Sequence, residues 1–365
     1  MTNELKSSRV VSTASWMIVI GLVIFTLIYF RSLIQPFILA LVVWYLIHAT
    51  RNLLGRIRLR GKQIPRWLSG ILAMLLTFGV IWFVIQIVSY NVNLIITKSS
   101  QYENNLETLV ENLQELTGIE NVDHFIQQQA EGLDYDLQSI ATGFLNSVSA
   151  LLGNAALVIV YVIFLLIEEN FVPGKLKNLV FKSNGKATLR DIIPRISKSV
   201  NTYFTVKFVT SLLTGVLSYI VLLIIGVDFA VLWAFLIFLF NFIPYVGSLV
   251  ATLLPSFFAI FQFASLLPFL WVFISVEVIQ ILVGNYIEPR IMGKTLNLSP
   301  LVVLLSLAFW GSIWGVVGMI LSVPIISVLV IILSHFPTTR NIAILLSEKG
   351  KLNGNLQQED LEPTP

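Results

Sequence analysis

Long apolar runs separated by short polar segments dominate the chain. Only two charged residues, Lys207 and Glu277, lie within these runs. A helix that crosses the hydrocarbon core of a bilayer needs about 20 mostly apolar residues. We therefore expect a helical protein that spans a membrane several times. The runs are 10–30, 33–49, 67–90, 144–167, 203–226, 229–263, 269–287 and 301–333.

Two of the runs, 229–263 and 301–333, are too long for one simple span, since each would form a helix of about 50 Å against a core of about 30 Å. Each is interrupted near its middle. The interruptions contain Asn241, Pro244 and Gly247 in the first run, and Gly311 and Gly315 in the second.

Proline removes a backbone donor and glycine permits a turn, so both runs are predicted to fold as helical hairpins, with re-entrant hairpins as one form of this fold. Transporters commonly bind their substrates at such interrupted helices. The alternative is one long, tilted and kinked span in each run. Two hairpins would place the loop 288–300 on the cytoplasmic side, whereas two kinked spans would place it outside.

The predicted fold class is therefore all-α. It is a polytopic helical membrane protein with about six full spans, two broken hairpins and an amphipathic external helical insert. The expected divisions are N-terminal spans with a basic cytoplasmic loop (1–90), the external insert (91–143), a transport core (144–336) and a cytoplasmic tail without stable structure (337–365).

Composition agrees with this pattern. Charged residues make up 12% of the 365 residues, against roughly 25% in soluble proteins. The chain has no cysteine, so it can form neither a disulfide nor a cysteine-ligated zinc site. No cofactor or metal is expected.

The distribution of charge predicts the orientation. Segment 50–66 carries six basic residues and no acidic one, and 168–202 is also basic, whereas 91–143 has nine acidic residues against Lys98 alone. The positive-inside rule places the two basic segments in the cytoplasm, and the acidic insert then lies outside. Both termini are expected to be cytoplasmic.

The acidic insert also contains an amphipathic helical pattern. Four glutamates step by four residues along one face, while leucines recur at helical spacing on another. We interpret the acidic face as a solvated surface, with attraction of cations as the alternative. The glutamates are Glu103, Glu107, Glu111 and Glu115.

Glu277 is the strongest candidate for function, because a carboxylate near the middle of an apolar span costs several kcal/mol unless it is neutral, paired or hydrated. Gln280 and Glu288 follow on the same helical face, with Asn285 beside them. A structural hydrogen bond between helices is the alternative role for Glu277. We interpret Lys207 as snorkelling to the membrane interface.

Two further charges, Glu288 and Arg290, flank Pro289 at the end of this helix, and taken alone they are interpreted as interfacial charges. Gly311 and Gly315 form a G-x-x-x-G pattern, which suits either close helix packing or a substrate loop.

An enzyme is not expected. Gly293, Lys294 and Thr295 match the end of a phosphate-binding loop, but Glu288 stands where its first glycine is required. The chain contains neither H-E-x-x-H nor G-x-S-x-G.

Four motifs in the C-terminal part carry a family resemblance. They are Phe240-Asn241-Phe242-Ile243-Pro244-Tyr245-Val246-Gly247, Gly284-Asn285-Tyr286-Ile287-Glu288-Pro289-Arg290-Ile291-Met292-Gly293, Leu296-Asn297-Leu298-Ser299-Pro300 and Leu321-Ser322-Val323-Pro324. In this order they resemble the autoinducer-2 exporter family of bacterial membrane transporters. The resemblance covers residues 200–335 well, and upstream it extends to layout only.

The resemblance implies a secondary transporter of the bacterial inner membrane, from a family named after export of the quorum-sensing signal autoinducer-2. Some relatives are described as sodium/proton antiporters, and family members are described as homopentamers. The expected partners are thus a small solute or ion, the lipid bilayer and further copies of the chain, and no nucleic acid.

The leading hypothesis is an inner-membrane transporter or facilitator that exports a small polar solute, and the alternative is a cation/proton antiporter. A structural membrane protein would leave the polar stripe and both breaks unexplained. The residues expected to form the transport site are Asn241, Pro244, Gly247, Glu277, Gln280, Asn285, Glu288, Arg290, Gly311 and Gly315.

Overall fold

The structure is a computed structural model of the whole chain. It describes residues 2–56, 58–59, 62–117, 153, 155–172, 174–175, 187–293 and 297–350. The expected external insert beyond residue 117 and most of the tail lie outside the described residues, as do the side chains of the four glutamates of the acidic face.

The described residues are helical apart from one short antiparallel pair of strands, β1 (Arg58–Leu59) and β2 (Lys62–Gln63). The predicted helical class is therefore confirmed, with this small exception in the basic loop. The helices are α1 (Thr2–Tyr29), α2 (Arg31–Arg56), α3 (Arg66–Thr117), α6 (Ala155–Glu168), α8 (Ala187–Ile225), α9 (Ala230–Phe240), α10 (Val246–Phe263), α11 (Leu266–Ile281), η1 (Leu282–Ile287), α12 (Glu288–Met292), α13 (Pro300–Ser334) and α14 (Arg340–Leu346).

Among the described residues, six helices are long and apolar enough to cross a membrane. Four coincide with runs predicted as single spans, and the other two are α10 and α13, which come from the two long runs. The apolar parts of α1 and α6 are shorter. The six are Arg31–Arg56, Trp67–Tyr102, Ile192–Ile225, Val246–Phe263, Leu266–Met292 and Pro300–Ser334.

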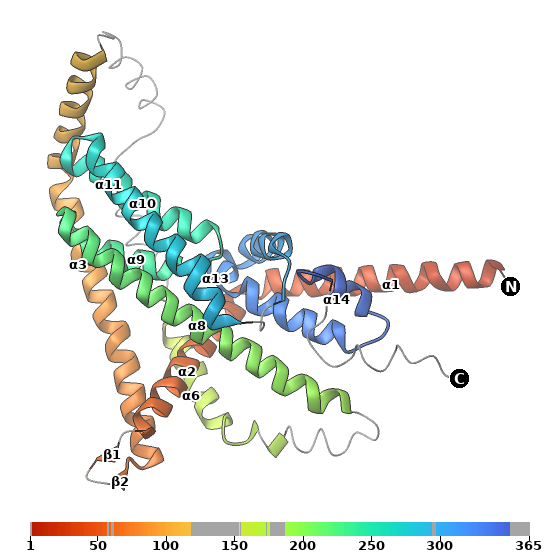
Figure 1. Cartoon of the computed structure of the whole chain (residues 1–365). Coiled ribbons are helices and arrows are strands. Elements are labelled where there is room, and N and C mark those ends of the chain that lie inside the picture. Colours follow the sequence, from red (N-terminus) through yellow and green to blue (C-terminus); the bar gives the residue numbers. More distant parts are fainter. Residues whose placement is uncertain are drawn as a thin grey trace. The chain divides into compact units, whose positions relative to one another are not determined.

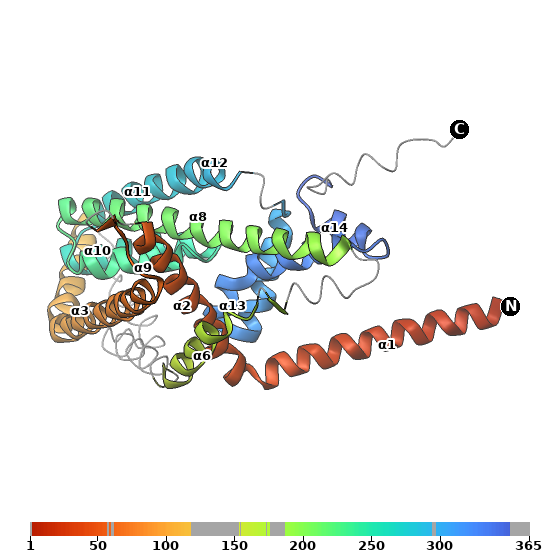
Figure 2. The same ribbon diagram turned by 90° about the horizontal axis from the view of Figure 1, so that it is seen from below.

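The chain divides into two compact units. The first contains 1–77, 153–182 and 306–322, and the second contains 78–152, 183–305 and 323–365. In the first unit α2 packs against α6, and in the second α8, α9, α10 and α11 lie side by side (Figure 1). The lengthwise packing of α11 along α8 can be followed in Figure 2.

The core of the second unit is aromatic. The Trp233 and Phe258 rings lie 5.1 Å apart between centroids, and the Tyr102 ring lies 5.2 Å from Phe258. Because Trp233 is on α9 and Phe258 is on α10, this contact requires the two helices to run back along each other. The run 229–263 thus reverses direction at residues 241–245.

Helix α3 continues well beyond the apolar run that predicted it, which ends at residue 90. Polar contacts to the second unit's core explain the extension. Lys98 forms an ion pair with Asp228 at 3.1 Å, the Tyr102 hydroxyl donates to the same carboxylate, and the Asn105 amide donates to the carbonyl of Phe261 at the end of α10.

The run 301–333 also reverses direction. The hydroxyl of Ser306 donates to the carbonyl of Ser322 over 2.9 Å, whereas in a straight helix these residues would be about 24 Å apart along the axis. The reversal is at Gly315, whose φ of 60° and ψ of −141° are not helical. Gly318 then lies so close to the first arm that an added Cβ would be 1.9 Å from the carbonyl oxygen of Trp310.

This close approach gives a test of the hairpin. Replacing Gly318 with Ala should lower the free energy of unfolding by about 1–3 kcal/mol, because the arms must separate to admit the methyl group. Gly79→Ala is the matched control, since an added Cβ there meets nothing within 4 Å. The measurement is thermal unfolding of the purified protein in detergent, and equal midpoints for the two variants would contradict the packing.

Candidate functional site

The second unit contains a cavity of about 460 Å³ that brings most of the predicted site residues together. Its lining comes from α8, the turn between α9 and α10, the start of α10, α11, η1 and α12, together with Val303 and Val323 of α13. The polar lining residues are Tyr203, Lys207, Asn241, Tyr245, Ser248, Glu277, Gln280, Asn285 and Glu288.

The turn between α9 and α10 forms one wall. Pro244 cannot donate a backbone hydrogen bond, and Tyr245 adopts φ 59° and ψ −62°, so the helix cannot continue through this segment. The Asn241 amide donates to the Ser211 hydroxyl of α8 over 3.2 Å. Gly247 lies behind the wall, where a Cβ would be 1.9 Å from the Phe240 carbonyl oxygen.

The opposite wall is α11 and its continuation, which carry the polar stripe predicted from the sequence. Between Leu282 and Ile287 the backbone widens to a π-helix, and Gly284 and Asn285 lie within it. Pro289 follows at the start of α12, and a proline disrupts the hydrogen bond to the residue four positions earlier. Such π-segments are frequent at functional sites, because they change the direction of side chains within a helix.

A buried ion pair forms part of the cavity lining. The Lys207 ammonium is 2.8 Å from the Glu288 carboxylate, and the two side chains are only 10% and 15% exposed. The Thr210 hydroxyl lies 3.4 Å from the same carboxylate. Lys207 and Glu288, which the sequence analysis treated as separate interfacial charges, are thus paired with each other in the cavity lining. Each supplies the counter-charge that the other needs when buried.

Glu277 lies farther along α11, and its carboxylate accepts a hydrogen bond of 3.2 Å from the Thr252 hydroxyl of α10. Among the described residues it forms no ion pair. Two other lining groups are buried without any hydrogen-bond partner in the described part of the chain, the amide nitrogen Nε2 of Gln280 and the hydroxyl of Tyr203. Unpaired polar atoms of this kind are costly and uncommon in folded proteins.

Four of the ten predicted site residues do not line this cavity. Gly247 shapes its wall, Arg290 is exposed outside the lining, and Gly311 and Gly315 belong to the first unit. Sequence reasoning missed Tyr203 and assigned Lys207 another role. The position of Lys207 in an apolar run was a signal of a functional role. Nothing in the sequence pattern distinguished Tyr203 from other aromatic residues of the apolar runs.

The second break has its own polar contacts, all within the first unit. The Gln35 amide of α2 donates to the carbonyl of Trp314 over 2.8 Å, immediately before the non-helical Gly315. The indole nitrogen of Trp314 donates to the carbonyl of Leu27 on α1 over 3.2 Å. The backbone group that the reversal leaves free therefore has a side-chain partner.

Comparison with known proteins identifies the family. The AI-2E family transporter profile matches residues 15–338. The chain is 31% identical to the AI-2 transport protein TqsA of Escherichia coli (strain K12) over 322 residues, which are 88% of this chain and 91% of TqsA.

Two further relatives extend the similarity to other bacteria. The chain is 34% identical to a protein of Haemophilus influenzae over 79% of its length and 83% of the relative's. YueF of Bacillus subtilis (strain 168) is 28% identical over 83% of this chain and 84% of YueF. With a family match across most of the chain and several candidate spans, this protein belongs to the AI-2E family of membrane transporters.

Proposed function

We propose that the chain is a secondary transporter or facilitator that exports a small polar solute through the cavity of the second unit. The volume of about 460 Å³ lies in the range of small-molecule sites. The similarity to TqsA makes autoinducer-2 the first solute to test.

The observation that carries the proposal is the pair of unpartnered polar groups, Gln280 Nε2 and the Tyr203 hydroxyl. Both atoms are covered by neighbouring side chains, so a polar solute would reach them after these side chains shift and would then supply the hydrogen bonds that they lack. Lys207 and Glu288, which are paired with each other, would orient polar groups of the solute and together add no net charge to the wall. The lining thus suits a solute that carries several hydroxyl or carbonyl groups.

The two hairpins fit the same role. In a bilayer, non-helical backbone is tolerated only where it lies within protein or lines a cavity. The turn at Asn241 to Tyr245 lines the proposed solute cavity. We infer that both hairpins are re-entrant, as in transporters whose broken helices form the substrate site. The proposed contacts from α11 and its continuation are Glu277, Gln280, Asn285 and Glu288, with Arg290 at the cytoplasmic end.

The proposed location is the bacterial inner membrane, with both termini, 50–66, 168–202 and 288–300 in the cytoplasm and 91–143 outside. We also infer a homo-oligomer, with a pentamer as the first expectation from the family resemblance. The chain itself would contain the complete solute path in 144–336.

Single cysteines test the orientation, because the native chain has no thiol of its own. A cysteine at Gln114 should react with an impermeant maleimide added outside whole cells, and one at Thr295 should react only after the cytoplasmic side is opened. Reaction at Gln114 from the cytoplasmic side alone would reverse the proposed orientation. External reaction at Thr295 would contradict two re-entrant hairpins.

Solute binding is tested by Gln280→Leu in purified protein reconstituted into liposomes. Uptake or efflux of autoinducer-2 should fall about tenfold, because a hydrogen bond to the solute is lost. Stability should stay level or rise, since the substitution removes an unpaired buried donor. Gln35→Leu is the matched control: its amide is already bonded to Trp314, so that variant should lose stability.

If Gln280→Leu transports at the native rate, this group does not bind the solute. If liposomes that contain the native protein show sodium/proton exchange but no transport of autoinducer-2, cation/proton antiport becomes the preferred function.

That alternative, a cation/proton antiporter, is favoured by Glu277. Its carboxylate lies in the cavity wall with one described polar partner, Thr252, and no described cation beside it. Exchange of a proton for a cation requires such a group, whereas transport of a neutral solute requires only hydrogen-bonding groups.

Glu277→Gln separates the two functions. Glutamine keeps the shape and the hydrogen bond from Thr252 but cannot release a proton. An antiporter should lose pH-dependent exchange at normal expression, while transport of a neutral solute should persist. The measurement is flux into liposomes between about pH 6 and about pH 8, with Thr252→Val as a control that removes the hydrogen bond and keeps the carboxylate.

A further inference from the structure

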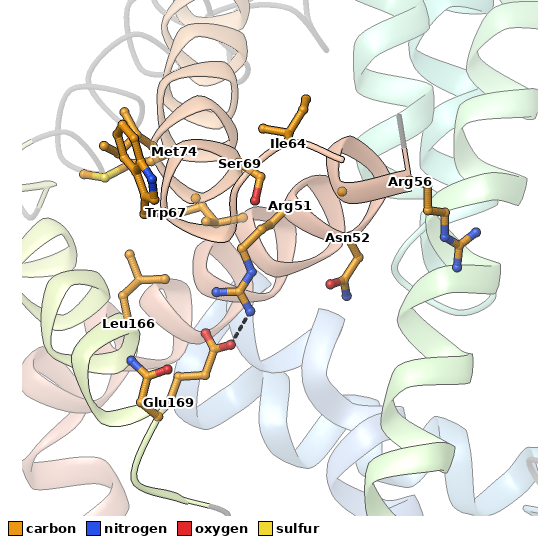
Figure 3. A pocket seen from close by; sticks show the side chains of 14 residues that line it. Arg51, Asn52, Arg56, Ile64, Trp67, Ser69, Met74, Leu166 and Glu169 are labelled. Carbon is orange, nitrogen blue, oxygen red and sulfur yellow. Dashed lines mark hydrogen bonds and ion pairs between the residues drawn. The ribbon is translucent and has the colours of Figure 1, made fainter. Parts of the chain in front are cut away.

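The first unit contains a second and larger cavity, of about 970 Å³, that the proposed solute path does not use. It lies where α2 ends, α3 begins and α6 ends (Figure 3). Its walls combine apolar side chains, such as Met74 and Leu166, with polar ones. The polar lining residues are Arg51, Asn52, Arg56, Ser69, Glu169 and Asn170.

Arg51 is the principal cation of this cavity. Figure 3 shows its guanidinium group directed at the carboxylate of Glu169, to which it is ion-paired. The contacts of Arg51 to Glu169 and to His48 both use the same nitrogen, Nη2. A guanidinium group has five N–H donors, so Nε and Nη1 have no protein partner among the described residues.

Glu169 fixes the position of Arg51 and balances its charge, but the cavity lining also contains Arg56 and therefore keeps a net positive charge. Its carboxylate also accepts a hydrogen bond of 3.0 Å from the Trp44 indole. Burial alone would raise the pKa of Glu169, but the hydrogen bonds from Arg51 and Trp44 and the charge of Arg51 hold this pKa below its ordinary value. The carboxylate is therefore charged at neutral pH and keeps the guanidinium in place.

The surrounding charge is positive. Arg56 is at the rim, with its side chain pointing away from Glu169 (Figure 3). The sequence from 57 to 66 adds four basic residues and no acidic one. A basic stretch of sequence of this kind favours the approach of anions. The added residues are Arg58, Arg60, Lys62 and Arg66.

The position of the cavity along the helices matches the membrane surface. The apolar run of α2 ends at residue 49 and that of α3 begins at residue 67, so the cavity lies at the boundary between apolar and charged sequence. Trp67 lines the cavity and is 68% exposed. Tryptophan is enriched at the level of lipid headgroups.

From these observations we propose that the cavity binds the phosphate group of an anionic phospholipid headgroup. The N–H groups on Nε and Nη1 of Arg51 would each donate a charge-assisted hydrogen bond to a phosphate oxygen. Asn52 would donate a further hydrogen bond, and Arg56 would add attraction at the rim. Basic pockets between membrane helices bind lipid headgroups in this way.

The acyl chains would then extend along the apolar surface of the first unit. Ile71 and Leu75, one and two turns into α3, are 51% and 65% exposed. A soluble phosphate ester would gain nothing from these side chains, whereas a lipid would bury them. This difference favours the lipid over a free phosphate as the occupant.

The test uses purified full-length protein in a zwitterionic detergent, titrated with phosphatidylglycerol, phosphatidylcholine or glycerol 3-phosphate and followed by native mass spectrometry. Phosphatidylglycerol should bind more tightly than either of the other two. Arg56→Gln should weaken its binding about fivefold, the effect of about one interfacial basic residue.

The combined change Arg51→Gln with Glu169→Gln removes the guanidinium and its carboxylate partner together, so neither charge is left buried without its partner. It should weaken binding of phosphatidylglycerol about tenfold. Arg195→Gln is the matched control: Arg195 is exposed, does not line the cavity, and lies in another predicted cytoplasmic segment, so binding should be unchanged.

Three outcomes would overturn the proposal. The first is equal binding of phosphatidylglycerol and phosphatidylcholine, and the second is an equal loss of binding in Arg56→Gln and Arg195→Gln, which would show attraction by general charge. The third is binding of glycerol 3-phosphate as tight as that of phosphatidylglycerol, which would assign the cavity to a soluble phosphate ester.

Discussion

A helix that reverses direction within an apolar segment leaves backbone groups without intrahelical partners, and this constraint organises both units. In each hairpin the arms meet so closely that a Cβ at Gly247 or Gly318 would be 1.9 Å from a carbonyl oxygen of the other arm. The freed groups must then lie against protein or a cavity, because lipid offers no hydrogen bonds. Gln35 satisfies one such group at Trp314, and the turn before Gly247 lines the cavity of the second unit.

The ion pair between Lys207 and Glu288 joins two elements of that cavity, α8 and α12. A buried pair contributes little net stability, because desolvation of both charges offsets their attraction. Loss of one partner, however, leaves an unpaired buried charge at a cost of about 3–5 kcal/mol. The pair therefore fixes how α8 and α12 meet more than it strengthens the fold. A charge pair retained at such a cost is typical of sites where polar groups serve a function.

The sequence was sufficient for features that depend on local pattern. Apolar length predicted the long helices, proline and glycine predicted the two reversals, and helical periodicity placed Glu277 and Gln280 on one face. Contacts between distant segments were not accessible in this way. Lys207 and Glu288 are 81 positions apart, and only packing of α8 against α12 reveals them as partners. The extension of α3 past residue 90 similarly depends on Asp228, which lies in another segment.

The scarcity of charge makes the position of each charged residue in the apolar runs informative. Lys207 and Glu277 are the two charged residues in those runs, and both line the cavity of the second unit. Purely structural hydrogen bonds between helices would have no reason to gather at one cavity, since any helix interface can hold them. The cavity also contains the turn at Pro244, the π-segment at Asn285 and two unpartnered polar groups. Each of these features is costly alone, and their coincidence at one cavity supports the proposed solute path.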